Sequence, residues 1–270
     1  MARKSQSRSG PSGVLTAYAV VVYLFLYAPI IVVTILSFND SPVVGFPFRR
    51  FTLKWFEVVF SNPDLARALG NSLLLGAISA VIATVLALFL ALAFRHDIVF
   101  KAALFNLILV PIIIPGVVSG AVLVVLFGLL NVELSLWTSV LIAHVTFILP
   151  FAFLNLHPRL HGFDTALEEA ASDLGATPGV VLREIVLPII WPGIIAAALF
   201  AFSLSFDEFV RTLLLTGFDR TLPVKFWYMI VEHLSPEAPV LAVVVMIISV
   251  VSAMVGFAFS SRRSNSGRPR

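Results

Sequence analysis

Two adjacent acids inside a long apolar segment, Asp207 and Glu208, are the side chains of this sequence best placed to do chemistry. An acid at the centre of a membrane-spanning helix costs about 2.5–3.5 kcal/mol, so such acids usually face a cavity or a charged partner. Arg211 follows Asp207 by four residues and Glu208 by three, and a helix would bring it within reach of either. Two interpretations therefore stay open: a local salt bridge near the membrane interface, or a pathway that attracts cations.

Aromatic residues accompany this acidic pair. Phe206 precedes the pair, and Trp227 with Tyr228 comes in the following segment. Aromatic rings gather at membrane interfaces, and their faces also hold organic cations. Because adjacent residues of a helix point about 100° apart, the two acids need not line one surface. For a substrate pathway, the candidate residues are Asp207, Glu208, Phe206, Trp227 and Tyr228.

The sequence lacks the compact motifs that would make the chain an enzyme by itself. It has no Gly-x-x-x-x-Gly-Lys-Ser/Thr phosphate loop, no Gly-x-Ser-x-Gly turn and no His-Glu-x-x-His motif. It has no cysteine, which excludes disulfides and thiolate metal sites. His157 and His161 have the spacing of a helical metal pair, but Pro158 lies between them and no suitably placed acid completes the set. We expect no catalytic residue, no metal site and no cofactor in this chain.

Composition indicates a membrane protein. Hydrophobic residues make up 59% of the 270 residues and charged residues only 12%, against about 25% charged residues in a typical soluble domain. A membrane-spanning helix needs about 20 apolar residues. We therefore expect an all-α integral membrane protein with about six transmembrane helices, surrounded by lipid. The expected spans are residues 14–36, 72–94, 102–130, 136–156, 189–215 and 240–259.

Charge at the two ends orients the chain. Arginine and lysine cluster at both termini, and basic flanks favour the cytoplasmic side of a membrane. The net charge of +3 is too small to indicate nucleic acid as a partner. We expect cytoplasmic tails over residues 1–13 and 260–270, and a transmembrane domain over residues 14–259 with a cytoplasmic loop at residues 157–188.

Two other segments carry local signals. Apolar residues at helical spacing predict a surface helix over residues 52–60. The third span contains Pro111 and Pro115, and its Gly116-x-x-x-Gly120 spacing permits close contact between helices. A kinked, tightly packed helix and a hinge beside a pathway are both compatible with this pattern.

The cytoplasmic loop predicts a helix–turn–helix. Thr165-x-x-Glu168 is a capping box that would start a helix, and Gly175 is placed to end it. Thr177-Pro178 would start the next helix, with threonine as the cap and proline at the first position. One narrow apolar face is formed by Leu167, Ala170, Ala171 and Leu174. This face would either pack on the protein's own helix ends or receive a partner.

A longer pattern spans this loop. Glu169-Ala170-Ala171 is followed after three residues by Gly175, and after nine more by Ile185-Val186-Leu187-Pro188. The pattern resembles the EAA signature of permease subunits in bacterial ABC importers. The likeness covers nearly the whole chain and is strongest to the second permease subunit of spermidine/putrescine importers. It extends to Asn71-Ser72, residues 147–151 and residues 205–210.

The resemblance implies a role for the loop. In that family the loop forms a coupling helix, which sits in a groove of a cytoplasmic ATPase and transmits ATP-driven closure to the membrane helices. By this likeness the coupling residues are Leu167, Glu168, Glu169, Ala170, Ala171, Leu174, Gly175 and Ala176.

The resemblance also implies the assembly and its cargo. It implies the type I ABC importer permease fold in the bacterial cytoplasmic (inner) membrane, with two ATPase subunits that bind ATP and Mg²⁺. A second permease, related but different, and an extracytoplasmic solute-binding protein would complete the importer. The implied substrate is a polyamine, or a related small organic cation or amino-acid-like solute. A gradient-driven secondary transporter or channel is the alternative, and a membrane scaffold without transport is a third interpretation.

Overall fold

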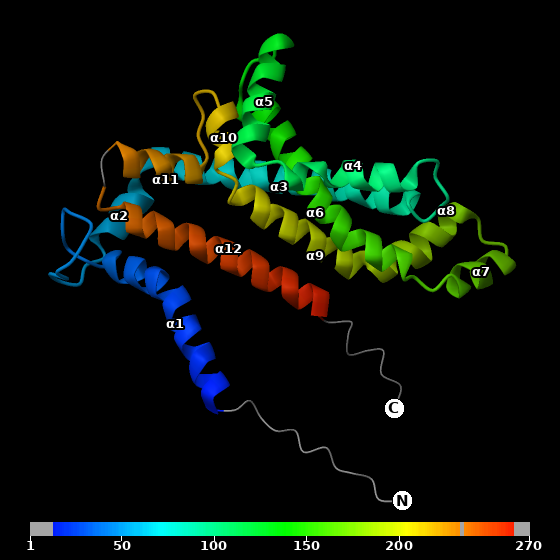
Figure 1. The fold of residues 1–270 in the computed structure, drawn as a ribbon, viewed down its shortest axis with the longest axis horizontal. Coiled ribbons are helices and arrows are strands. Elements are labelled where there is room, and N and C mark those ends of the chain that lie inside the picture. Colours follow the sequence, from blue (N-terminus) through cyan, green and yellow to red (C-terminus); the bar gives the residue numbers. More distant parts are fainter. Residues whose placement is uncertain (1–12, 233–234, 262–270) are drawn as a thin grey trace, which may run out of the picture.

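The computed structural model describes residues 13–232 and 235–261, and Figure 1 shows their arrangement. Across these residues the chain is nearly all helical, and extended backbone pairs in an isolated bridge between Asn39 and Phe51. The expected all-α class is confirmed. The tails expected at residues 1–13 and 260–270 fall almost wholly outside the described residues.

Helices follow one another along the described chain, with a long connection over residues 37–53, shorter ones elsewhere, and two π-helical turns, Leu136–Val140 and Leu182–Val186. The α-helices are α1 (Gly13–Leu36), α2 (Lys54–Ser61), α3 (Pro63–Ala93), α4 (Lys101–Ile113), α5 (Gly116–Leu129), α6 (Leu141–His161), α7 (Ala166–Asp173), α8 (Pro178–Val181), α9 (Leu187–Phe206), α10 (Val210–Leu215), α11 (Leu222–Val231) and α12 (Ala238–Ser261).

The number of apolar spans agrees with the sequence. In the part of the chain that the structure describes, five helical runs are long and apolar enough to cross a membrane, and α4 with α5 makes a sixth if the pair counts as one span. The surface helix predicted over residues 52–60 is α2.

The third span is broken rather than kinked. The axes of α4 and α5 differ by 102°, and the break falls between Ile113 and Gly116. Pro115 takes the N-cap position of α5 in extended backbone, and its missing N–H costs nothing there. The single span predicted over residues 102–130 therefore consists of two helices, and α5 leaves the direction of the bundle.

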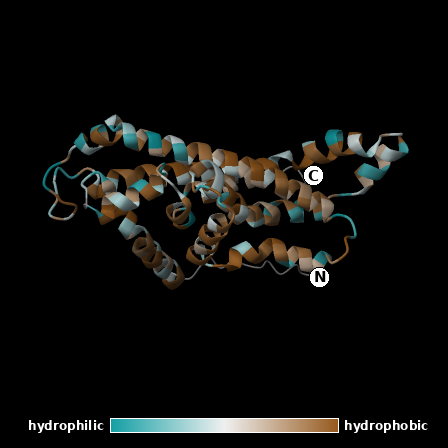
Figure 2. Ribbon diagram, turned by 90° about the horizontal axis from the view of Figure 1, so that it is seen from above, coloured by the Kyte–Doolittle hydropathy of each residue, from teal (hydrophilic) through white to brown (hydrophobic). Residues whose placement is uncertain are grey.

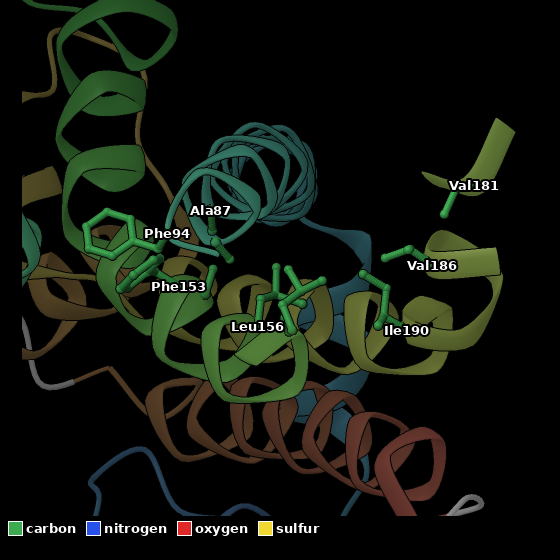
Figure 3. Close-up of a cluster of buried hydrophobic side chains, with 11 residues drawn as sticks. Ala87, Phe94, Phe153, Leu156, Val181, Val186 and Ile190 are labelled. Carbon is green, nitrogen blue, oxygen red and sulfur yellow. The ribbon is translucent and has the colours of Figure 1, made fainter. Parts of the chain in front are cut away.

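The core of the bundle lies where α3, α6, α9 and α12 pack on one another (Figure 1). Ala83, Ala87 and Ala91 recur every four residues on α3 and have no exposed surface. Such small side chains let helix backbones approach closely inside a membrane. Toward α8 the buried cluster also contains larger side chains. Figure 3 shows this cluster and labels Ala87, Phe94, Phe153, Leu156, Val181, Val186 and Ile190.

Two helices lie at the edge of this bundle. No residue of α1 is buried, and α1 packs mainly on α12. In Figure 1, α5 projects away from the long helices, and its own packing is mainly on α10. Figure 2 shows hydrophobic residues along most of the helices, and many of their large apolar side chains are exposed. Apolar surface of this extent requires lipid or another protein chain around it.

The fifth span differs from its predicted bounds of residues 189–215. One helical run begins at Pro178 and ends at Phe206, and α10 follows as a separate short helix after a break over residues 207–209. Asp207 and Glu208 therefore lie in a break, not inside a regular helix.

The helix start predicted at Thr177-Pro178 is confirmed, and this helix continues through Pro188 for a local reason. A proline inside an α-helix clashes with the carbonyl four residues earlier. Here the π-helical turn Leu182–Val186 comes directly before Pro188, and its wider hydrogen-bonding pattern accommodates the proline ring. Near the middle of the run, Gly193 lets the Arg159 side chain of α6 approach, and a Cβ at Gly193 would lie 2.6 Å from Arg159 Cδ.

Candidate functional site

The predicted coupling segment forms a helix that ends as the sequence indicates. Gly175 has φ +85°, in the left-handed region that suits glycine. The Gly175 N–H donates to the Ser172 carbonyl at 2.9 Å, and the Ala176 N–H donates to the Ala171 carbonyl at 3.0 Å. These two bonds form a Schellman motif, which fixes where α7 stops.

The start of α7 differs from the predicted capping box. Thr165 has helical backbone angles, and its side chain makes no cap hydrogen bond. Asp164 takes that role instead, since its Oδ1 accepts from the Ala166 N–H at 3.0 Å. The Glu168 carboxylate does not turn back to the helix start, because it pairs with a distant arginine.

An ion pair joins α7 to the end of α3. Arg95 directly follows the C-cap of α3, and its guanidinium donates to Glu168 Oε1. The two side chains are 18% and 24% exposed, and the Arg95 guanidinium also lies 5.6 Å from the Phe163 ring centre. Glu168 therefore holds α7 against its own bundle.

The apolar face of α7 divides into two parts. Ala171 and Ala176 pack against the core cluster near α8. Leu167 and Leu174, in contrast, are 46% and 90% exposed, and Glu169, Ala170 and Gly175 are exposed beside them. One part of this face therefore packs on the protein itself, as the first alternative predicts, and the other part is exposed.

A cavity of about 670 Å³ lies between α7 and the helix ends near it. The Arg95–Glu168 pair forms part of the cavity wall. The cavity therefore separates part of α7 from the bundle, and the ion pair connects the two. The other lining residues are Leu92, His96, Leu160, His161, Phe163, Thr165, Ser172, Pro178, Val181, Leu182 and Val186.

At the opposite end of the helical run, the two acids have different partners. Asp207 is exposed and accepts a hydrogen bond from the Ser249 hydroxyl of α12 at 2.7 Å. Glu208 pairs with Arg211 at 2.8 Å, and the two side chains are only 9% and 6% exposed. The salt bridge expected for one of the acids belongs to Glu208.

Arg211 makes three further contacts. Its Nε donates to the Ser119 hydroxyl of α5 at 2.9 Å, and its guanidinium lies 4.0 Å from the centre of the Phe147 ring of α6. Its backbone N–H donates to Glu208 Oε1 at 3.0 Å. The Glu208 carboxylate therefore binds Arg211 twice, once through the backbone and once through the side chain.

Gly116 and Gly120 bring α5 close to α10. A Cβ at Gly120 would lie 2.7 Å from Leu214, and a Cβ at Gly116 would lie 3.4 Å from the Arg211 guanidinium. The close helix contact predicted from Gly116-x-x-x-Gly120 is confirmed, and its partner is α10.

A buried histidine, which the sequence reasoning did not select, connects the two sides of the break. His144 is 1% exposed; its Nδ1 lies 2.7 Å from the Ser205 hydroxyl and its Nε2 lies 2.8 Å from the Thr212 hydroxyl. Thr212 donates to the Glu208 carbonyl at 2.9 Å, so its oxygen accepts from a protonated Nε2 and Nδ1 accepts from Ser205. The feature of the sequence that could have pointed to this residue is a histidine within an otherwise apolar segment.

The predicted aromatic candidates do not join the acids around one centre. Phe206 is buried in a cluster with α2, α3, α11 and α12. Trp227 lies 5.3 Å from Phe209, and the Tyr228 ring holds the Arg220 guanidinium at 3.9 Å. Over residues 13–232 and 235–261, no group of three or more His, Cys, Asp and Glu side chains is arranged to hold a metal ion.

Comparisons with known proteins bear on both regions. Residues 83–264 match the family described as "Binding-protein-dependent transport system inner membrane component". The chain is 36% identical over 232 residues to the spermidine/putrescine transport system permease protein PotC of Escherichia coli K12, covering 85% of this chain and 87% of the relative. It is 31% identical to the putrescine transport system permease protein PotI of the same strain, covering 83% and 82%.

A solved structure has the same fold. It is a bacterial ABC transporter involved in the import of the acidic polysaccharide alginate, with a TM-score of 0.72 and 18% sequence identity. The match covers 93% of this chain and 95% of the other.

Proposed function

Because the chain belongs to the family of binding-protein-dependent transport system inner membrane components, we propose that it serves the import of polyamines or a related small organic cation. As a family member it is a multi-pass permease subunit of an ABC importer in the inner membrane. The family leaves the gradient-driven carrier and the membrane scaffold without support.

The observation that best supports the substrate is the likeness to PotC over most of both chains. The position of Asp207 is consistent with it. This carboxylate is exposed at the break after α9, and it accepts from a neutral hydroxyl. A negative charge of this kind in an apolar surrounding attracts cations.

Coupling to an ATPase is the second part of the proposal. The open part of α7 offers Leu167, Glu169, Ala170, Leu174 and Gly175 to a partner. Three other predicted coupling residues contact this chain instead and hold α7 in position. Glu168 pairs with Arg95, and Ala171 and Ala176 pack against the core. ATP and Mg²⁺ would bind to the partner, since this sequence has no phosphate loop.

The family supports the rest of the proposed assembly. Two ATPase subunits, a second permease and an extracytoplasmic solute-binding protein would complete the importer, with both ends of this chain in the cytoplasm. The exposed apolar surfaces of α1 and α5 suit contact with a second permease and with lipid.

Reconstitution tests this function. The importer, purified in mild detergent with its co-purifying subunits, is placed in liposomes with its binding protein, and uptake of radiolabelled spermidine and putrescine is measured with and without internal ATP. We expect ATP-dependent uptake, competed by unlabelled polyamine. Uptake of another solute alone would contradict the polyamine assignment, and purification without any ATPase would contradict the coupling assignment. Assembly with Gly175→Trp gives the matched negative control.

A further inference from the structure

Arg211 is a charged side chain buried inside a membrane-spanning protein, with its guanidinium surrounded on several sides. The Glu208 carboxylate is at 2.8 Å, the Ser119 hydroxyl at 2.9 Å and the Phe147 ring centre at 4.0 Å. These groups come from different elements: the break before α10, α5 and α6. The chain therefore builds a pocket for a cation and fills it with a cation of its own.

The chemistry of this pocket is not particular to a guanidinium. A carboxylate, a hydroxyl acceptor and an aromatic face are the groups that bind organic ammonium ions, through charge-assisted hydrogen bonds and cation–π attraction. A buried carboxylate that loses its partner is strongly unfavourable, so Glu208 needs a cation whenever it stays out of water. An ammonium group can meet that need as well as an arginine.

The position of Arg211 allows such an exchange. It lies on α10, which has only six residues and is bounded by the break at residues 207–209 and by extended backbone at Thr216. Ser119 lies on α5, beyond the bend of 102°. Phe147 stays in the bundle core on α6. Rotation of the short helix α10 relative to α5 and α6 would separate the guanidinium from both Ser119 and Phe147.

We propose that Glu208, Ser119 and Phe147 form an organic-ammonium site, which Arg211 occupies in the conformation described here and leaves when substrate passes. The inference rests on the proposed function, because it assigns a site within the same permease. It makes Arg211 a tethered competitor of the substrate: the site is closed to cargo while the guanidinium fills it.

The test asks whether a free ammonium can replace the missing side chain. In the assembled importer carrying Arg211→Gln, spermidine chloride should raise the apparent Tm by about 3 °C or more relative to NaCl of equal ionic strength. Wild type and Arg211→Lys should show no such gain, because a tethered cation still fills the site. The double variant Arg211→Gln with Glu208→Gln should lose the gain.

Arg220→Gln provides the matched control. It removes another guanidinium that lies over an aromatic ring, that of Tyr228, at 3.9 Å. Spermidine should not stabilise this variant beyond wild type. Equal stabilisation of Arg220→Gln and Arg211→Gln, or stabilisation of Arg211→Gln by NaCl alone, would overturn the proposed site.

A second variant keeps the proposal testable if Arg211→Gln fails to assemble. Phe147→Leu retains the ion pair and the apolar bulk but removes the aromatic face. We expect the KM for polyamine uptake to rise about 5-fold with little change in the maximal rate. An unchanged KM, with or without a lower Tm, would assign Phe147 and Arg211 to structure alone.

The outcomes distinguish failure of the proposed ammonium site from failure of the proposed polyamine substrate. Polyamine uptake by wild type without stabilisation of Arg211→Gln would reject the site and keep the proposed function. Absence of polyamine uptake, together with stabilisation of Arg211→Gln by γ-aminobutyrate but not by spermidine, would keep the ammonium site and reject the polyamine.

Discussion

Two pairs of neighbouring acids, Glu168–Glu169 on α7 and Asp207–Glu208 after α9, stand at opposite ends of one helical run. In each pair one acid is bound by an arginine and the other is exposed. The arginine partner of Glu168 is 73 residues away and links two helices, whereas the partner of Glu208 is three residues away on the adjoining short helix.

The two ion pairs differ in how far water can reach their side chains. The Arg95–Glu168 side chains are 18% and 24% exposed, so water replaces a lost partner at modest cost. The Glu208–Arg211 side chains are 9% and 6% exposed within a membrane protein, where a lost partner leaves an uncompensated charge. The same type of ion pair therefore joins α7 to α3 at one end and neutralises a buried charge at the other.

The largest expected effect is a loss of uptake when the exposed surface of α7, around Glu169, is changed. We expect Gly175→Trp or Glu169→Lys to abolish uptake while the protein still reaches the membrane, because both alter the open surface of α7. Transport assays with immunoblots of the membrane fraction measure this. Gly179→Ala and Glu184→Lys are matched controls, at exposed positions of the same loop. Normal uptake in both test variants would remove α7 from the coupling mechanism.

The next effect concerns the buried acid. Glu208→Gln leaves the Arg211 charge unpaired and should destabilise the assembled importer by about 3 kcal/mol. The apparent Tm, followed by fluorescence on heating, should drop by roughly 6 °C or more. Glu57→Gln, an exposed acid of α2, should leave it unchanged. A Tm near wild type for Glu208→Gln would show that water reaches this ion pair.

Asp207→Asn sharpens the contrast inside the second pair. The substitution removes the charge and keeps an oxygen that can accept from Ser249. Loss of a favourable charge interaction of about 1.4 kcal/mol corresponds to about a tenfold fall in uptake efficiency for a cationic substrate. Co-purification of the ATPase should be unaffected. If affinity and rate stay unchanged, Asp207 has only its structural bond to Ser249.

The smallest effect is expected for the inner acid of α7. Glu168→Gln should lower stability by at most about 1 kcal/mol, because the pair with Arg95 is partly solvated. Denaturation of the single variants and of Arg95→Gln with Glu168→Gln measures the coupling energy between the two side chains. A loss of stability as large as that of Glu208→Gln would show that the two ion pairs contribute equally.

The sequence predicted features that depend on local chemistry. Length and apolarity indicated the spans, and Gly175 indicated the end of α7, because each feature depends on one continuous stretch of neighbouring residues. The break after Phe206 was not predicted, since the apolar character continues through Leu213–Leu215 and conceals it. The assignment of Arg211 to Glu208 also depends on that break.

Partners that are far apart in the sequence could not be predicted. His144 bonds to residues 61 and 68 positions later, and Glu168 takes Arg95 instead of its own helix start. These contacts exist because α3, α6 and α9 pack together, which no local pattern encodes. The predicted coupling and pathway residues remain predictions about partners and substrate.

The helical run Pro178–Phe206 also has the proportions of a lever. Its 29 residues, at about 1.5 Å each, span roughly 43 Å. Gly193, which lies close to Arg159 of α6, sits near its midpoint and offers a fulcrum. With arms of nearly equal length, a rigid rotation about Gly193 would move the Asp207 end by a similar distance, and in the opposite direction, to the end next to α7.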